Sequence, residues 1–368
     1  MIYFDSAATT LQKPASVPAA VADAINTMTT PGRGDHPAAR LAAELMLSCR
    51  MEAAELFGVS QPENVVLTAN ATHAMNTAIR TLVSPGDTVI ISGYEHNAVT
   101  RPLHAIGGVS CRIVNGRLFD REQMAEGFRR AVDGGVKAVI CTHTSNVFGY
   151  TLPMDDIAAV CRERGTPLVV DASQSAGIQP VDLKRWGAAY VAMPGHKGLY
   201  GPQGTGLLLC GEGQTPSPLM EGGTGSLSLQ QDMPDFLPDR LEAGTQNVHG
   251  AAGLLEGMRF VRSLGLEEIR RRESLVIRTL AEGLRGNGNY RIFADPRGES
   301  SVLSVLPLRE APETLADRLA EQGVAVRAGL HCAPLAHRTA GTEKTGTLRF
   351  SASAFNTPAE AEAVLKML

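Results

Sequence analysis

Residues 167–211 read "PLVVDASQSAGIQPVDLKRWGAAYVAMPGHKGLYGPQGTGLLLCG", and this stretch carries the pattern that decides the fold. Two short apolar runs, 167–172 and 188–193, are separated by a segment of helical length, which predicts parallel strands joined by a crossover. A third apolar run, 204–211, follows a turn rich in Gly and Pro and is expected to be an antiparallel neighbour. The stretch therefore predicts part of an α/β sheet.

The same alternation extends over residues 16–210. Further candidate strands are 65–69, 88–92 and 137–142. Apolar strands alternating with amphipathic helices predict a largely parallel sheet with helices on both faces. Residues 212–245 lack periodicity and are rich in Gly, Ser and Pro, so we expect a long functional loop there rather than a linker.

The pattern changes near residue 250. A long helical stretch over 250–285 is followed by a shorter alternation of strands and helices, which predicts a second, smaller α/β unit of ordinary domain size. We therefore expect a large domain over 16–250, a small C-terminal domain over 251–368, and an N-terminal segment, 1–15, that packs with the small domain.

The composition excludes several classes of protein. A formal charge of −4 without a basic run argues against binding to nucleic acid or to an anionic membrane surface. No apolar run is long enough to cross a bilayer, and the acidic residue Asp5 argues against a signal peptide. From the sequence we expect a soluble cytoplasmic protein.

Five of the six cysteines lie in strand-like or helix-like apolar runs, which predicts small buried side chains in a reducing compartment. These five are Cys49, Cys111, Cys141, Cys161 and Cys210. Cys332 differs, because it lies in "RAGLHCAPLAH" (327–337), which we expect to be irregular. At this stage Cys332 could be a buried thiol, a metal ligand or a nucleophile.

Polar residues follow the predicted strands at the point where each strand ends, and ligands of open α/β sheets bind at that edge. In chain order these residues are Thr72, His96, Asn146, Asp171, Gln174, His196 and Lys197. Each alone has an ordinary explanation, such as a helix cap, a loop histidine or a surface lysine. Together they meet the needs of pyridoxal 5′-phosphate, namely an anion cradle, a ring stacker, a partner for the ring nitrogen and an amine for the aldehyde. Neither a G-x-G-x-x-G motif nor a P-loop competes with this interpretation.

Four motifs add a family resemblance: "VVDASQSAG…VAMPGHKGLYGPQGTGLLL", "EAGTQN", "VRAGLHCAP" and "LRFSASAFNT". The chain resembles the class V aminotransferase fold, in its cysteine desulfurase and selenocysteine lyase branch, from "FDSAATT" to the C-terminus. The "RxGxHCA" loop is similar to that of the group II, SufS-like enzymes. The resemblance implies a pyridoxal-phosphate-dependent transferase of fold type I, with a mostly parallel seven-stranded sheet and a smaller C-terminal α/β domain.

The resemblance also implies roles for residues around the cofactor. Lys197 would bind the aldehyde, Asp171 would pair with the ring nitrogen, His96 would stack on the ring and Gln174 would contact the phenolic oxygen. The phosphate would lie against a loop and a strand end that contribute Ala71, Thr72 and His196. Thr245 would reach the phosphate from a partner subunit, which implies a homodimer with shared active sites.

For the substrate, Asn146 and Arg349 would hold the carboxylate, and a planar guanidinium suits that task. His36 and Arg327 match positions near the entrance, and Cys332 would be the nucleophile. The expected reaction converts L-cysteine to L-alanine and leaves a persulfide on Cys332, from which a sulfur-acceptor protein would take the sulfur.

The sequence leaves two alternatives open and disfavours a third. L-Selenocysteine could be the substrate of the same site, or the chain could be a plain aminotransferase or β-lyase in which Cys332 is incidental. A sulfur-relay partner or a zinc protein using His331, Cys332 and His337 is disfavoured, because adjacent His and Cys hardly face one tetrahedral metal. We therefore expect no metal site.

The chain departs from the family pattern at three places. The common Gly-Thr-Thr phosphate loop is Asn70, Ala71 and Thr72 here, and Pro194 stands where a serine is frequent. Both changes remove hydroxyl donors for a phosphate. The stretch "AHRTAGTEKTGT" (336–347) also differs from the group II pattern, which alters the entrance beside Cys332.

Overall fold

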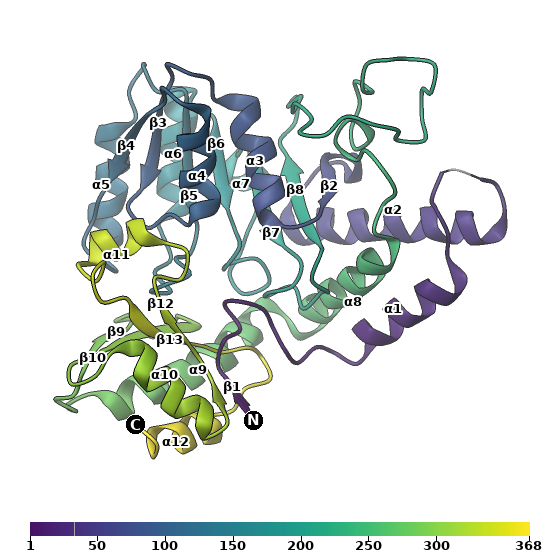
Figure 1. Ribbon diagram of the computed structural model, residues 1–368. Coiled ribbons are helices and arrows are strands. Elements are labelled where there is room, and N and C mark those ends of the chain that lie inside the picture. The colour runs from purple at the N-terminus through teal and green to yellow at the C-terminus, as the bar shows by residue number, and fades with distance from the viewer. Residues whose placement is uncertain (33) are drawn as a thin grey trace.

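The computed structural model describes residues 1–32 and 34–368, and its largest feature is a seven-stranded sheet (Figure 1). The strand order is β2-β8-β7-β6-β5-β3-β4. Strands β4, β3, β5, β6 and β7 run parallel, while β8 is antiparallel to β7 and β2 is antiparallel to β8. The strands are β2 (Val65–Thr68), β3 (Thr88–Ser92), β4 (Ser110–Val114), β5 (Ala138–Thr142), β6 (Leu168–Asp171), β7 (Tyr190–Pro194) and β8 (Gly206–Cys210). The predicted, mostly parallel sheet is confirmed.

Helices cover both faces of this sheet, as the alternation predicted. Helices α3 (Ala71–Leu82) and α4 (Asn97–Ile106) pack on one face, in a core that includes Met75 and Leu103. Helices α5 (Arg121–Ala131) and α6 (Met154–Arg164) contribute to the core of the other face. The connection from β6 to β7 contains the short helix α7 (Leu183–Trp186). Because β4, β3, β5, β6 and β7 run parallel, their carboxyl ends lie at the same end of the sheet. The polar residues that follow these strands can meet there.

Three long helices extend to the side of the sheet (Figure 1). Helix α8 (Val248–Leu264) packs against α1 (Ser16–Thr27) and α2 (Pro37–Phe57), and spans the boundary that we expected at residue 250. Gly265, at a φ of 83°, separates α8 from α9 (Leu266–Leu284). The stretch predicted as one long helix is therefore two, because the chain turns at a glycine.

A second, antiparallel sheet has the order β12-β13-β10-β9. Its strands are β9 (Tyr290–Phe293), β10 (Val302–Pro307), β12 (Arg327–Gly329) and β13 (Thr347–Ser351). Helices α9, α10 (Pro312–Glu321) and α12 (Pro358–Leu365) pack on it around a core that includes Phe4. The N-terminal strand β1 (Ile2–Tyr3) pairs in parallel with β11 (Val324–Ala325), so both chain ends lie beside this sheet (Figure 1).

The structure corrects two further expectations, which concern the loop around Cys332 and the burial of Cys111. The stretch 327–337 is not irregular throughout, because it begins as β12 and ends inside α11 (Pro334–Ala340). Pro334 occupies the first turn of that helix, where the missing N–H costs nothing. Cys111 is exposed on the edge strand β4, whereas the other four cysteines predicted to be buried are buried.

The long segment between β8 and α8 has little regular structure, as expected. A short 3₁₀ helix, η2 (Asp239–Leu241), interrupts it, and a second one, η1 (Pro62–Asn64), precedes β2. Among the described helices, none combines the length and the apolar character that a bilayer crossing requires.

Candidate functional site

The carboxyl ends of the parallel strands surround one cavity, with about 500 Å³ of empty space. Its lining unites most of the site residues predicted from the sequence. These are Ala71, Thr72, His96, Asn146, Asp171, Gln174, His196 and Lys197. Residues separated by more than a hundred positions in the chain are neighbours here, because successive strands deliver them to the same edge.

Lys197 follows β7 in a turn and has a perturbed amine. Burial lowers the pKa of Lys197 to about 8, because the charged ammonium loses hydration. The carboxylate of Asp171 opposes this shift, and the cations of Arg349 and Arg327 add to it. At pH 7 about a tenth of Lys197 is therefore the neutral amine, far more than for an ordinary lysine, and this is the form that can add to a carbonyl group or take up a proton.

Asp171 is the last residue of β6 and is buried. Its Oδ1 accepts a hydrogen bond of 2.9 Å from the backbone N–H of Ser173. A carboxylate in such a place is stable only where donors or cations face it. The side chain also lines the cavity, so it offers a negative charge to a cationic ring nitrogen placed there.

His96 caps the N-terminus of α4, and its Nδ1 accepts a hydrogen bond from the backbone N–H of Ala98 at 3.0 Å. In the neutral ring Nε2 therefore carries the hydrogen. Burial lowers the pKa of His96, although the charge of Asp171 acts in the opposite direction. A neutral, flat ring at the wall of the cavity is suited to stacking on an aromatic ligand.

The N-terminus of α3 also lines the cavity. Asn70 caps this helix by accepting from the backbone N–H of His73 at 2.9 Å, and Ala71 and Thr72 form its first turn. Unpaired backbone N–H groups at a helix N-terminus attract anions. His196 borders the same cavity.

Cys332 lies on the loop between β12 and α11 and is exposed. Its backbone carbonyl accepts a hydrogen bond from the N–H of Asn97 at 2.8 Å, and Asn146 Nδ2 donates to the carbonyl of His331 at 2.7 Å. His331 and Cys332 both have positive φ values, 50° and 56°. Two residues beside the cavity thus hold a strained loop that carries an accessible thiol.

Arg327 and His331, the two basic residues near this thiol, differ in their contact with its sulfur. Arg327 Nη2 lies 3.8 Å from Cys332 Sγ. The ring of His331 is buried instead, with Nε2 placed 3.1 Å from the carbonyl of Thr347. Burial, and next the charge of Arg349, lower the pKa of His331 to about 2. Arg327, rather than His331, is therefore the cation that contacts the sulfur.

Arg349 on β13 is buried and ion-paired. Its Nη2 lies 2.6 Å from Asp5 Oδ1, and Nη1 donates to the carbonyl of Asn146 at 3.0 Å. Its Nε has no hydrogen-bond partner within the part of the chain that the structure describes. Asp5 was not among the predicted site residues, although a lone carboxylate in the apolar N-terminal segment was the signal that could have indicated it.

Two predicted residues lie apart from this cavity in the single chain. His36 is exposed at the start of α2, where its Nδ1 accepts from the backbone N–H of Ala39 at 3.3 Å. Thr245 is also exposed and lines a separate cavity together with His73 and Asn247. The structure brings neither residue into the cavity around Lys197.

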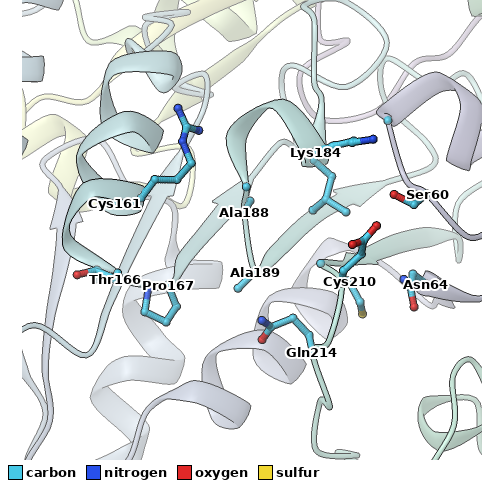
Figure 2. A pocket seen from close by; sticks show the side chains of 17 residues that line it. Ser60, Asn64, Cys161, Thr166, Pro167, Lys184, Ala188, Ala189, Cys210 and Gln214 are labelled. Carbon is cyan, nitrogen blue, oxygen red and sulfur yellow. The ribbon is translucent and has the colours of Figure 1, made fainter.

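A larger hollow, with about 1050 Å³ of empty space, lies where β6 and β7 begin, at the amino-terminal ends of these strands (Figure 2). Thr166 and Ala189, which precede β6 and β7, line it together with Cys161 and Cys210. Burial raises the pKa of both thiols to about 12, so they are protonated at neutral pH. This hollow contains none of the predicted site residues and is a poor candidate for nucleophilic chemistry.

Metal ligation finds no support in the described part of the chain. Within residues 1–32 and 34–368, no cluster of three or more His, Cys, Asp or Glu side chains could hold a metal ion. His331 and His337 are buried, with their rings 5.7 Å apart, while Cys332 is exposed.

Comparisons with known proteins agree with this geometry. Residues 2–364 match the family described as aminotransferase class-V. The chain is 30% identical to a probable cysteine desulfurase of Mycolicibacterium paratuberculosis, covering all of this chain and 54% of that protein. It is 31% identical to a probable cysteine desulfurase of Methanothermobacter thermautotrophicus, covering 89% of this chain and 84% of that one. The apo structure of a cysteine desulfurase from Thermococcus onnurineus superposes with a TM-score of 0.89 at 28% identity, covering 99% of this chain and 93% of that one.

Proposed function

This chain belongs to the aminotransferase class-V family, and on that basis we propose that it is a pyridoxal 5′-phosphate-dependent cysteine desulfurase. The reaction would take sulfur from L-cysteine, release L-alanine and leave a persulfide on Cys332. The observation that carries the proposal is the exposed thiol of Cys332, held beside a cavity that contains the perturbed amine of Lys197.

The residues around the cavity fit this cofactor. An anion site at the N-terminus of α3 and His196 suit the phosphate, and Asp171 suits the protonated ring nitrogen. His96 offers a flat, neutral ring for stacking, and Lys197 offers an amine with a pKa of about 8. When bound, the cofactor supplies an aldehyde for the substrate amine and a ring that withdraws electrons from Cα.

The protein residues divide the remaining work. Lys197, with its amine partly neutral, takes the proton from the substrate Cα and returns it in a later step. Asp171 keeps the ring nitrogen protonated through its negative charge. Arg327, 3.8 Å from Cys332 Sγ, would donate a hydrogen bond to that sulfur and hold it in place.

The sulfur transfer would be a displacement at the substrate sulfur, which keeps its thiol proton and is therefore neutral and open to attack. The Cys332 thiolate forms a bond with that sulfur while the substrate Cβ–S bond breaks. The electron pair of the broken bond stays with the substrate carbon, which takes up a proton and leaves as part of L-alanine. Cys332 then holds the persulfide, and its exposed position leaves it open to a sulfur acceptor.

Arg349 and Asn146 remain our candidates for the substrate carboxylate. The unpaired Nε of Arg349 is a buried donor that lacks an acceptor, and such a group is costly unless a ligand meets it. Asp5 holds the other end of the guanidinium and fixes its orientation. A buried, oriented guanidinium would select a substrate with a free α-carboxylate.

We also propose a homodimer in which Thr245 of one subunit approaches the phosphate bound by the other. Thr245 is exposed and stays outside the cavity of its own chain, which supports a role across an interface. All six cysteines are unpaired, which fits the reducing cytoplasm that we propose as its location.

The decisive experiment replaces the thiol and measures the products. Cys332→Ala should keep the yellow absorbance of the bound cofactor but lose nearly all sulfide and alanine production from L-cysteine. Cys111→Ala is the matched control, because Cys111 is the other exposed thiol and lies on β4. Lys197→Ala should abolish both the covalently bound absorbance and the activity.

The same assays separate the alternatives. Full activity of Cys332→Ala on L-cysteine would contradict the nucleophile role. Turnover of L-selenocysteine far above that of L-cysteine would indicate a selenocysteine lyase. Amino-group transfer from L-alanine to a keto acid, without sulfide release from L-cysteine, would indicate an aminotransferase.

A further inference from the structure

The N-terminal segment contacts His196 at its ring and at its backbone carbonyl. Thr9 Oγ1 lies 3.0 Å from Nδ1 of the His196 ring. The backbone carbonyl of His196 accepts hydrogen bonds from the N–H and the hydroxyl of Thr10, both at 3.1 Å. Among residues 1–32 and 34–368 no protein group bonds to His196 Nε2, and the residue lines the cofactor cavity.

These contacts fix the direction of the Thr9 hydroxyl hydrogen. Lys13 Nζ donates to Thr10 Oγ1 at 2.8 Å, so the hydroxyl of Thr10 donates onward, and the carbonyl of His196 at 3.1 Å is a nearer acceptor than that of Lys197 at 3.4 Å. Together with the N–H of Thr10, that carbonyl then has both lone pairs occupied. Thr9 Oγ1 lies 3.2 Å from the same carbonyl but closer to Nδ1, so its hydrogen is left for Nδ1.

The ring of His196 is neutral near pH 7, so it has one donor and one acceptor nitrogen. Burial lowers the pKa of His196 to about 4, and the nearby cations of Lys197 and Lys13 contribute. If Nδ1 accepts from Thr9, Nε2 must carry the hydrogen. The free nitrogen is then a donor, the kind of group that a phosphate oxygen needs.

We infer that Thr9 is a positioning residue that holds His196 in the tautomer with a donor Nε2, aimed at the phosphate of the bound cofactor. The inference rests on the proposed function, because it takes the ligand of this cavity to be pyridoxal 5′-phosphate. The principle is the one that governs metal-binding histidines, in which a hydrogen bond to one ring nitrogen sets the state of the other.

The neighbouring substitutions make this donor more important. Ala71 has no hydroxyl and Pro194 has neither a hydroxyl nor a backbone N–H, although both line the cavity. The side chain of Asn70 already accepts from His73 and caps α3. Fewer side-chain hydrogen-bond donors therefore remain for an anion here. If Nε2 of His196 were an acceptor instead of a donor, a large part of the remaining side-chain donors would be lost.

The test compares two cofactor forms on the apoprotein. We expect Thr9→Val to weaken binding of pyridoxal 5′-phosphate about tenfold, since a charge-assisted hydrogen bond is lost. Binding of pyridoxal, which lacks the phosphate, should stay within about twofold of wild type by the same argument. Thr9→Ser keeps the hydroxyl and should restore the binding of both forms. Equilibrium titration followed by absorbance and protein fluorescence measures all of these affinities.

The control is Thr279→Val on α9, which removes a hydroxyl that bonds only to its own helix. Unchanged affinity of Thr9→Val for the phosphorylated form would overturn the inference, as would equal weakening of both forms, which indicates a purely structural role. Wild-type protein that binds pyridoxal 5′-phosphate tightly but leaves L-cysteine unchanged would refute the proposed function alone. Wild-type protein with no preference for the phosphorylated form would refute both.

Discussion

At the scale of single residues, Glu273 on α9 is an acid that the proposed reaction does not use. It is buried, and its Oε1 accepts from the hydroxyl of Tyr200 at 3.2 Å. Among residues 1–32 and 34–368, its Oε2 has no hydrogen-bond partner. Burial raises the pKa of Glu273 to about 8. The folded protein therefore holds a proton that the unfolded chain releases above its ordinary pKa of 4.5.

This difference makes stability depend on pH with a definite sign. Below pH 4.5 both states are protonated and Glu273 has no effect. Between pH 4.5 and about 8 the folded state binds one more proton than the unfolded state, so stability falls as pH rises. The loss is about 1.4 kcal/mol for each pH unit in this window.

We therefore expect Glu273→Gln to raise the melting temperature relative to wild type, by an amount that grows from pH 5 to pH 8. The amide retains an acceptor for Tyr200 but has no proton to lose. Glu282→Gln is the control, since Glu282 is exposed on the same helix and should show no such trend. Thermal unfolding over this pH range measures the effect, and a constant difference between Glu273→Gln and wild type would contradict it.

At the scale of elements, the ion pair between Arg50 and Glu242 forms hydrogen bonds with the backbone of β2, an edge strand of the large sheet. Arg50 Nη1 donates to the carbonyl of Val65 at 2.6 Å, and Glu242 accepts from the N–H of Leu67 at 2.7 Å. The two side chains also form two hydrogen bonds to each other, at 2.7 and 2.6 Å. Both are buried, so the edge is closed to further strand pairing.

Removal of one partner should cost far more than removal of both. Arg50→Met leaves the carboxylate of Glu242 buried and unpaired, and we expect a loss of about 3–5 kcal/mol of stability. The double variant Arg50→Met with Glu242→Gln should recover a large part of that loss, because no buried charge remains. Urea unfolding measures both. A double variant less stable than Arg50→Met alone would show that the pair does not act as a unit.

The features that sequence patterns predicted poorly all depend on the folded structure rather than on local sequence. The stretch 327–337, which we expected to be irregular, contains Pro334, and proline is compatible with the first turn of a helix such as α11. Gly265 lies in a stretch with helical periodicity, and its positive φ of 83° is a property of the folded backbone. Cys111 has strand-like neighbours, but its exposure follows from the position of β4 at the sheet edge, which local sequence does not encode.

At the scale of the whole molecule, most of the cavity was predictable from one rule. Parallel strands end at one edge, so the polar residues after each strand, such as Asp171 and Lys197, had to meet. The contacts of the N-terminal segment were not predictable in this way. Asp5 bonds Arg349 across 344 positions of the chain, and Thr9 meets His196 across 187. Such pairings depend on the pairing of β1 with β11 and on the bridge between Asp5 and Ser351 of β13, which no local pattern specifies.

The proposed dimer can be tested through its shared sites. If Thr245 acts across the interface, a subunit with Lys197→Ala still offers its native Thr245 to the other subunit. A subunit with Thr245→Val still offers its own native Lys197. A heterodimer of these two variants would therefore contain one complete site and one site with both defects. If Thr245 acted within its own chain, no site in the heterodimer would be complete.

We expect the heterodimer, assembled by co-expression with two tags, to bind one pyridoxal 5′-phosphate per dimer with the affinity of a heterodimer of wild type and Lys197→Ala. The Thr245→Val homodimer should bind about tenfold more weakly, because each of its sites lacks a hydrogen bond to the charged phosphate. Titration with limiting cofactor, followed by absorbance, distinguishes the two affinities. If the heterodimer bound as weakly as that homodimer, Thr245 would act in its own chain. If sedimentation showed an active monomer, the shared site itself would be wrong.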